Sequence, residues 1–247
     1  MNHEVTIAIL TPSCRDPKWD FKNAQLALNT RLLQAMAPLP IHWLGGKRIT
    51  NFEFRGRLKT SLLPQGRQKL LDEAIDDGFD YALWWDDDVA ASPDALGYLL
   101  SRNVASVAAN VLCKGIPDNK EKFPDDGIWY SAAGEDGKPI SSLGKTGTEK
   151  CYAAGMAYHL VHLPSIKPIP RPHFEVRWNE QKQDYAGEDW FFVRKLADAG
   201  IPTIIDHDAS MLCSHIGDWH YNINNMAMFM KSGKAIQKLM EMMQEKK

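Results

Sequence analysis

Mainly apolar runs of four to twelve residues recur along the chain and predict β-strands. The run Val5 to Leu10 is rich in β-branched residues and stops at Thr11-Pro12-Ser13, which is typical of a strand covered on both faces. Similar runs predict further strands at Ile41 to Leu44, Asp80 to Trp85, Val104 to Cys113, Cys151 to His162 and Ile201 to Asp206.

Between these runs, apolar residues recur with helical spacing. A stripe of Ala24, Leu28, Leu32 and Met36 predicts a helix from about residue 21 to 36, and Leu70, Leu71, Ala74 and Ile75 predict another. Ser92-Pro93-Asp94 combines an N-cap serine with a first-turn proline and an acid, so we expect a helix to begin there. The segment Glu188 to Ala199 predicts a helix that Gly200 closes.

The alternation of strands and helices predicts an α/β fold, namely a single Rossmann-like domain over residues 1–247 with a mixed, mostly parallel central sheet flanked by helices. Residues 114–150 are poor in aliphatic side chains and predict a long excursion, with a hairpin around Glu135 to Lys138. The four prolines of Pro164 to Pro172 predict an irregular crossing, and residues 225–247 predict a Met-rich helical tail.

The composition of the chain excludes several classes of protein. A net charge of -2 argues against a dedicated nucleic-acid binder, and no segment has the roughly 18 apolar residues of a transmembrane helix. The N-terminus lacks a signal-peptide pattern, and Cys14, Cys113, Cys151 and Cys213 are too far apart for a C-x-x-C zinc site. We therefore expect a reduced, cytoplasmic protein.

The strongest candidate for chemistry is the acidic triplet Asp86-Asp87-Asp88, which directly follows a hydrophobic strand. Ligands of parallel sheets bind beyond the carboxyl ends of the strands, and three adjacent carboxylates favour a hard divalent cation. In an extended backbone Asp86 and Asp88 would face the same ligand. The alternative is an exposed acidic turn before a helix.

A second acidic pair, Glu188 and Asp189, stands at a helix start. Both acids are also typical of residues that complement the helix dipole. Gly187 permits close backbone approach, and Trp190 with its two phenylalanine neighbours would hold the turn in the core. Such a rigid carboxylate suits a general base.

Three further positions are weaker candidates. His215 follows an apolar pair, but a lone histidine is more often structural, and His207 competes with it for any metal role. Arg67 at a helix start suits a diphosphate or is an ordinary solvated arginine. The small residues Ala154 and Gly155 mark either close approach of a ligand or tight packing.

Taken together, these residues resemble the metal-dependent nucleotide-sugar glycosyltransferases of the GT-A fold. The resemblance spans about Val5 to Tyr221. It rests on an ordered set of elements: Thr11-Pro12-Ser13, Arg67, the D-x-D element Asp86-Asp87-Asp88, Ala154-Gly155-Met156, Gly187-Glu188-Asp189-Trp190 and Cys213-Ser214-His215-Ile216-Gly217.

This resemblance implies a role for each position. Asp88 and His215, with Asp86, would bind Mn²⁺ or Mg²⁺, and Glu188 or Asp189 would act on the acceptor hydroxyl. The residues expected around the nucleotide-sugar donor are Thr11, Pro12, Ser13, Arg67, Asp86, Asp87, Ala154 and Gly155. The implied partners are a UDP- or GDP-linked sugar and a glycan or other hydroxyl acceptor. The metal would offset the charge that builds on the leaving diphosphate.

Several alternatives stay open at this stage. Clustered acids also suit a metal-dependent nucleotidyltransferase, although the first strand is followed by no glycine-rich phosphate loop. Eight tryptophans also suit a non-catalytic carbohydrate-binding protein. The sequence leaves inversion or retention undecided, and assigns acceptor recognition or lid closure to residues 114–150. The basic, Met-rich tail suits a membrane surface, a partner or packing on the domain.

Overall fold

The computed structural model describes residues 3–12, 47–57, 62–114, 128–180, 183–216, 220–228 and 230–231. Within these ranges a seven-stranded central sheet has the order β2-β1-β3-β7-β5-β10-β6. Its strands are β1 (His3–Pro12), β2 (Lys47–Arg57), β3 (Tyr81–Trp85), β5 (Ser106–Ala109), β6 (Thr148–Lys150), β7 (Tyr158–His162) and β10 (Ile204–Asp206).

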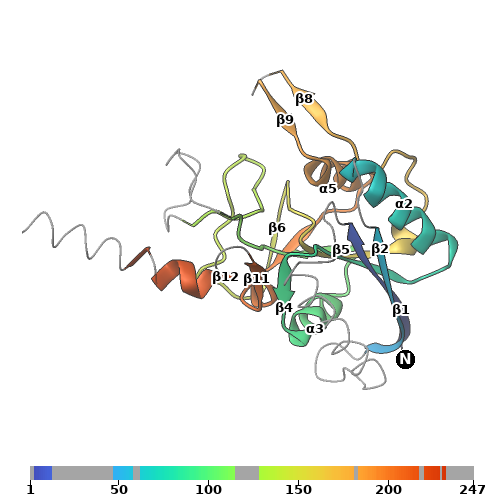
Figure 1. Cartoon of the computed structure of the whole chain (residues 1–247), viewed down its shortest axis with the longest axis horizontal. Helices are drawn as coiled ribbons and strands as arrows, with labels where there is room; N and C mark the ends of the chain where they lie inside the picture. The colour runs from blue at the N-terminus through green and yellow to red at the C-terminus, as the bar shows by residue number, and fades with distance from the viewer. Residues whose placement is uncertain are drawn as a thin grey trace, which may run out of the picture.

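The strand directions make this sheet mixed and mostly parallel. Strand β1 pairs in parallel with β2 and β3, and β10 pairs in parallel with β5. Strand β7 runs antiparallel between β3 and β5, and β6 runs antiparallel beside β10. Helices cover both faces (Figure 1), so the predicted α/β fold class is confirmed. That the whole chain is one domain stays a prediction.

One face of the sheet packs against α2 (Leu63–Asp76) and α5 (Glu188–Asp198). The apolar stripes of both helices close on alternate strand residues such as Leu10 and Trp84, which point to this side. Phe192 of α5 is fully buried here. Helix α5 ends where Gly200 adopts a φ of 80°, a left-handed conformation that glycine adopts without strain, as the sequence predicts.

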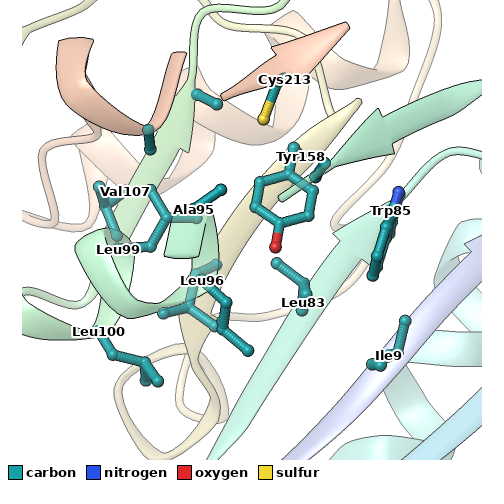
Figure 2. Packing of buried hydrophobic residues seen from close by; sticks show 14 of the residues in the cluster. Ile9, Leu83, Trp85, Ala95, Leu96, Leu99, Leu100, Val107, Tyr158 and Cys213 are labelled. Atoms are coloured by element: carbon teal, nitrogen blue, oxygen red, sulfur yellow. The ribbon is translucent and has the colours of Figure 1, made fainter. Parts of the chain in front are cut away.

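The opposite face packs against α3 (Pro93–Ser101). Its residues Leu96 and Leu99 contact a cluster that includes Leu83, Trp85 and Tyr158 (Figure 2). The helix begins as predicted, because the Ser92 side chain accepts a hydrogen bond from the Asp94 amide. Strands β1 and β3 are therefore buried on both sides, which fixes the position of their carboxyl ends.

Smaller elements surround this core. A three-stranded sheet joins β4 (Val89–Ala91), β11 (Cys213–Ile216) and β12 (His220–Tyr221), and β8 (Arg177–Asn179) pairs with β9 (Asp184–Ala186). The β8–β9 hairpin projects from the body beside α5 (Figure 1). The remaining short helices are α4 (Leu163–Ile166) and α6 (His207–Ser210).

Some sequence-based expectations need correction. Residues 128–150 do not all loop out, because Ile128, Tyr130 and Ile140 are buried and β6 joins the sheet. The tight turn predicted around Glu135 to Lys138 is present, with Gly134 and Lys138 hydrogen-bonded. The proline-rich crossing contains α4 at its start, because Pro164 occupies a first-turn position that needs no amide donor.

Other expectations fall outside the described residues, namely the helix at 21–36 and the strand at Ile41 to Leu44. Of the predicted C-terminal tail, residues 225–228 and 230–231 are described, and Met226 packs against Ile128 and Tyr130. In the part of the chain that the structure describes, no helix is both long enough and apolar enough to cross a bilayer.

Candidate functional site

The acidic triplet lies at the carboxyl end of β3 but forms a turn. The Val89 amide donates to the Asp86 carbonyl over 3.1 Å, so Asp87 and Asp88 are the central residues of this turn. The expectation of an extended backbone through the triplet was therefore wrong. Aspartate favours turns because its side chain bonds to nearby amides, and here the turn leads directly into β4.

Asp88 lies beside His215, although 127 residues separate them in the sequence. Strand β11 pairs antiparallel with β4, and the Ile216 amide donates to the Asp88 carbonyl over 2.7 Å. The Asp88 Oδ1 and His215 Nε2 atoms are 3.1 Å apart. On the other side of the ring, Nδ1 donates to the Leu112 carbonyl over 2.7 Å.

The Leu112 carbonyl fixes the tautomer of His215. A carbonyl oxygen only accepts hydrogen bonds, so the Nδ1 atom carries a proton. In the neutral ring, the Nε2 lone pair would then face the Asp88 carboxylate. Two such acceptors are held together by a shared cation, either a proton on Nε2 or a metal ion.

Lys114 supplies a second positive charge at this point, because its ammonium group contacts Asp88 Oδ2. Burial by itself would raise the pKa of the Asp88 carboxyl, but His215 and Lys114 together hold it well below the ordinary value. Asp88 is therefore a buried carboxylate that stays ionised in a cationic setting.

Asp86 takes part in a different cluster. Arg67 of α2 donates from Nη2 to Asp86 Oδ1 over 3.1 Å and from Nε to Glu188 Oε1 over 3.2 Å. Its guanidinium lies 5.5 Å from the Trp84 ring centroid, and only 4% of the side chain is exposed. Burial lowers the pKa of Arg67, but the nearby carboxylates of Asp86, Glu188 and Asp189 raise it above its ordinary value. The starts of α2 and α5 are thus joined at the end of β3.

Asp189 sits between two glycines. A Cβ atom at Gly187 would stand 2.6 Å from Asp189 Oδ1, and one at Gly155 would stand 3.8 Å from Oδ2. The Trp190 amide donates to Oδ1 over 2.8 Å. The missing Cβ of Gly187 therefore leaves room for the Asp189 carboxylate, and the predicted donor-sugar segment at Gly155 lies next to the predicted base.

The surroundings of Asp189 favour its protonated form. Burial raises the pKa of Asp189 to about 6, and the negative charges of Glu188 and Asp86 add to this, while the Trp190 amide and Arg67 oppose it. Burial and the Asp189 charge likewise raise the pKa of the Cys113 thiol to about 11, so Cys113 lies near the site as an unreactive thiol.

The remaining residues that we expect around the nucleotide-sugar donor lie along the same edge of the sheet. Thr11 and Pro12 end β1, and the buried Thr11 hydroxyl donates to the Trp85 carbonyl over 2.8 Å. Asp87 and Ala154 are buried, and the Asp86 amide donates to the Ala157 carbonyl. Ser13 lies outside the described residues.

The competing histidine, His207, lies in another part of the fold. Its Nδ1 is 2.9 Å from the Ser142 hydroxyl, its Nε2 is 3.3 Å from Glu149, and its ring is buried. His159 and His162 pack on opposite faces of β7, against Phe192 and Tyr81. Burial lowers the pKa of His159 to about 3, with Arg67 adding to the effect, so this ring is neutral.

A metal ion fits Asp88 and His215 by the chemistry of these donors. In the described ranges, no three His, Cys, Asp or Glu side chains gather in a metal-binding group. One carboxylate and one fixed imidazole are a partial ligand set, which leaves positions for phosphate oxygens and water. The contact of Lys114 with Asp88 shows that a cation is accommodated there.

Sequence reasoning missed Lys114, Cys113, Ser131 and the Leu112 carbonyl. Lys114 and Cys113 follow β5, whose carboxyl end lies at the same sheet edge as that of β3, and this strand-end position was the available signal. Ser131 has no such signal. A Cβ at Gly155 would stand 3.5 Å from its hydroxyl oxygen, a contact set by tertiary packing alone.

No protein-family model matches this sequence, and no curated protein matches it either. Among solved structures, A197 from STIV is similar with a TM-score of 0.53 and 13% identity, covering 86% of each chain. This likeness bears on the fold alone.

Two structures of glycosyltransferases are also similar, with lower scores. The catalytic domain of Drosophila beta1,4galactosyltransferase 7, in complex with xylobiose, has a TM-score of 0.43 and 15% identity over 87% of this chain and 71% of that one. GalNAc-T7 with UDP, GalNAc and Mn²⁺ has a TM-score of 0.46 and 12% identity over 89% and 44%. At TM-scores below 0.5 neither likeness decides what this chain does.

Proposed function

We propose that this protein is a GT-A-type glycosyltransferase, which moves a sugar from a UDP- or GDP-linked donor to a hydroxyl group of an acceptor. A divalent Mn²⁺ or Mg²⁺ ion would hold the diphosphate. The observation that carries the proposal is the Asp88–His215 pair, in which a carboxylate and a tautomerically fixed imidazole face one another over 3.1 Å.

Asp88 and His215 would bind the metal ion, which on binding supplies positive charge to the diphosphate as it leaves. Lys114 already contacts Asp88, so its ammonium group would turn to the phosphate oxygens once the ion takes its place. Asp86 is bound to Arg67, so its role toward the ribose or the metal rests on the resemblance alone.

Arg67 and Glu188 would position the reacting groups. Glu188 accepts from Arg67, so it is tied to the frame of the site, whereas Asp189 Oδ2 points toward Gly155. We therefore assign the general base to Asp189 and a positioning role to Glu188. By the resemblance, the small residues Ala154 and Gly155 would border the donor sugar beside that base.

In the proposed transfer one bond breaks, one bond forms and one proton moves. The bond between the anomeric carbon and the diphosphate oxygen breaks, and its electron pair leaves with the nucleoside diphosphate. The acceptor oxygen forms the new bond to the anomeric carbon, and its proton passes to Asp189. A retaining enzyme needs no such base, so the assignment of Asp189 implies inversion: an α-linked donor would give a β-linked product, which NMR of the product checks.

The test is hydrolysis of UDP- and GDP-linked sugars by the purified chain, measured with and without Mn²⁺. We expect hydrolysis that depends on Mn²⁺, and at least about a 100-fold loss of rate in Asp88→Ala, because charge stabilisation at the leaving group is removed. Asp94→Asn, an exposed acid of α3, is the matched control and should keep the wild-type rate.

Two results would contradict the proposal. The first is the lack of any nucleotide-sugar binding across the donor panel with Mn²⁺ present. The second is release of pyrophosphate from a nucleoside triphosphate and a sugar phosphate, which would identify a nucleotidyltransferase. Glycan binding without metal or donor would point to a carbohydrate-binding protein.

A further inference from the structure

The β8–β9 hairpin carries two exposed aromatic rings. Trp178 and Tyr185 lie opposite each other in its ladder, with ring centroids 5.0 Å apart and planes at 70°. Their exposed fractions are 44% and 67%, far above those of the core aromatic residues. Such large exposed apolar side chains cost solubility, and their clustering usually marks a binding surface.

The hairpin is held firmly beside the candidate site. Strand β9 leads through Gly187 into α5, so Asp189 follows Tyr185 by four positions, a Cα–Cα span of at most about 14 Å. At the base of β8, the Arg177 guanidinium lies 4.4 Å from the Phe191 ring centroid of α5 and pairs with Glu175 over 2.9 Å. The aromatic pair therefore belongs to a hairpin that is joined to α5 and contacts it, within a short stretch of chain from Asp189.

The chemistry of this surface fits a sugar ring better than a protein partner. The exposed area of two half-exposed rings is far smaller than the roughly 800 Å² that a stable protein interface buries on each side. A pyranose has an apolar C–H face that an aromatic ring can cover, and hydroxyl groups at its edge. The exposed charged side chains of Arg177 and Asp184 are next to the rings in sequence, so they are available to hydroxyl groups.

We propose that Trp178 and Tyr185 form the acceptor platform. A pyranose ring of a glycan acceptor stacks on this pair, which directs a hydroxyl of the chain toward Asp189. The inference rests on the proposed function and assigns acceptor recognition to the hairpin, in place of the segment 114–150 that the sequence suggests.

The test measures acceptor and donor binding separately on the full chain. Saturation-transfer NMR probes a panel of glucose, galactose, mannose, xylose and N-acetylglucosamine and their disaccharides, in the presence of Mn²⁺ and UDP or GDP. Binding of the nucleotide is measured in the same samples. The variants are Trp178→Ala, Tyr185→Ala and the conservative Trp178→Phe, with Phe54→Ala as a control at an exposed aromatic residue of β2.

We expect at least one saccharide to bind the wild type, with about tenfold weaker binding in Trp178→Ala and Tyr185→Ala, as for truncation of an aromatic anchor. Trp178→Phe should restore part of the affinity, and nucleotide binding should be equal in all variants. Nucleotide binding without saccharide binding, or saccharide binding that the alanine variants leave unchanged, would overturn the acceptor platform alone. Failure of the wild type to bind UDP or GDP would overturn the proposed function and the acceptor platform with it.

Discussion

The Nε atom of Arg67 donates to Glu188 Oε1 over 3.2 Å and thereby ties the N-terminal half of α2 to the first turn of α5. The same guanidinium bonds to Asp86 at the end of β3, so one buried cation joins three elements. Removal of this cation would leave two carboxylates without their partner at a partly buried site.

We therefore predict that Arg67→Ala lowers the free energy of unfolding by about 2–4 kcal/mol, as for a broken buried ion pair. Arg67→Lys should recover only part of this loss, because an ammonium group lacks the planar fork that reaches both carboxylates. Urea denaturation at pH 7 measures both variants. Equal stability of Arg67→Ala and the wild type would contradict the structural role of this residue.

Gly187 offers a test of the position of Asp189. A Cβ atom in Gly187→Ala would stand 2.6 Å from Asp189 Oδ1, so the carboxylate must rotate away. We expect stability within about 1 kcal/mol of the wild type, because a side-chain end can move, and a fall in sugar transfer of at least tenfold, because the base is displaced. Donor binding should stay unchanged. Ala199→Ser at the other end of α5 is the control, and full transfer activity of Gly187→Ala would contradict this role for Asp189.

The pH dependence of transfer reports on the same carboxyl group. Because burial raises the pKa of Asp189 to about 6, the group is a base only above that pH. The rate of transfer should rise about tenfold per pH unit below pH 6 and reach a plateau above it. In Asp189→Asn the residual rate should lack this rise. A wild-type profile that is flat between pH 5 and pH 7 would argue against Asp189 as the base.

Stability should show the opposite trend with pH. Folding raises the pKa of Asp189 from 3.8 to about 6, so its stabilising effect is complete below pH 3.8 and lost as the pH rises through 6. Asp189→Asn keeps the shape of the neutral carboxyl group. It should be more stable than the wild type by about 1–2 kcal/mol at pH 7.5, a difference that partial exposure of the site keeps small, and equally stable at pH 4. Asp198→Asn, at an exposed acid of α5, is the control for the substitution itself.

Local sequence pattern predicted much of the framework. The pattern is clear wherever an element buries a continuous apolar run or an apolar stripe. This holds for strands β1 and β3 and for helices α2, α3 and α5. Strand β2 was missed, because it lies at the sheet edge and mixes charged and apolar residues. The reversed direction of β7 was missed as well, since a buried run carries no mark of its direction.

The candidate site was predicted where its residues follow a strand or open a helix. Asp86 to Asp88 and Glu188 with Asp189 stand at such points, and the structure brings both groups to one edge of the sheet. The sequence could not predict that Asp86 and Asp88 have different partners. Asp86 reaches Arg67 because the triplet forms a turn, and Asp88 reaches His215 because β4 pairs with β11.

The proposed function depends on the Asp88–His215 pair, so binding of Mn²⁺ to this pair is the decisive measurement. Electron paramagnetic resonance of Mn²⁺, titrated with the purified chain in the presence of UDP or GDP, measures this binding. We predict that Asp88→Asn and His215→Ala each weaken Mn²⁺ binding by at least about tenfold, while Asp94→Asn binds as the wild type does. Mn²⁺ binding of equal strength in the wild type and both variants, or none in any of them, would contradict the metal site and the function built on it.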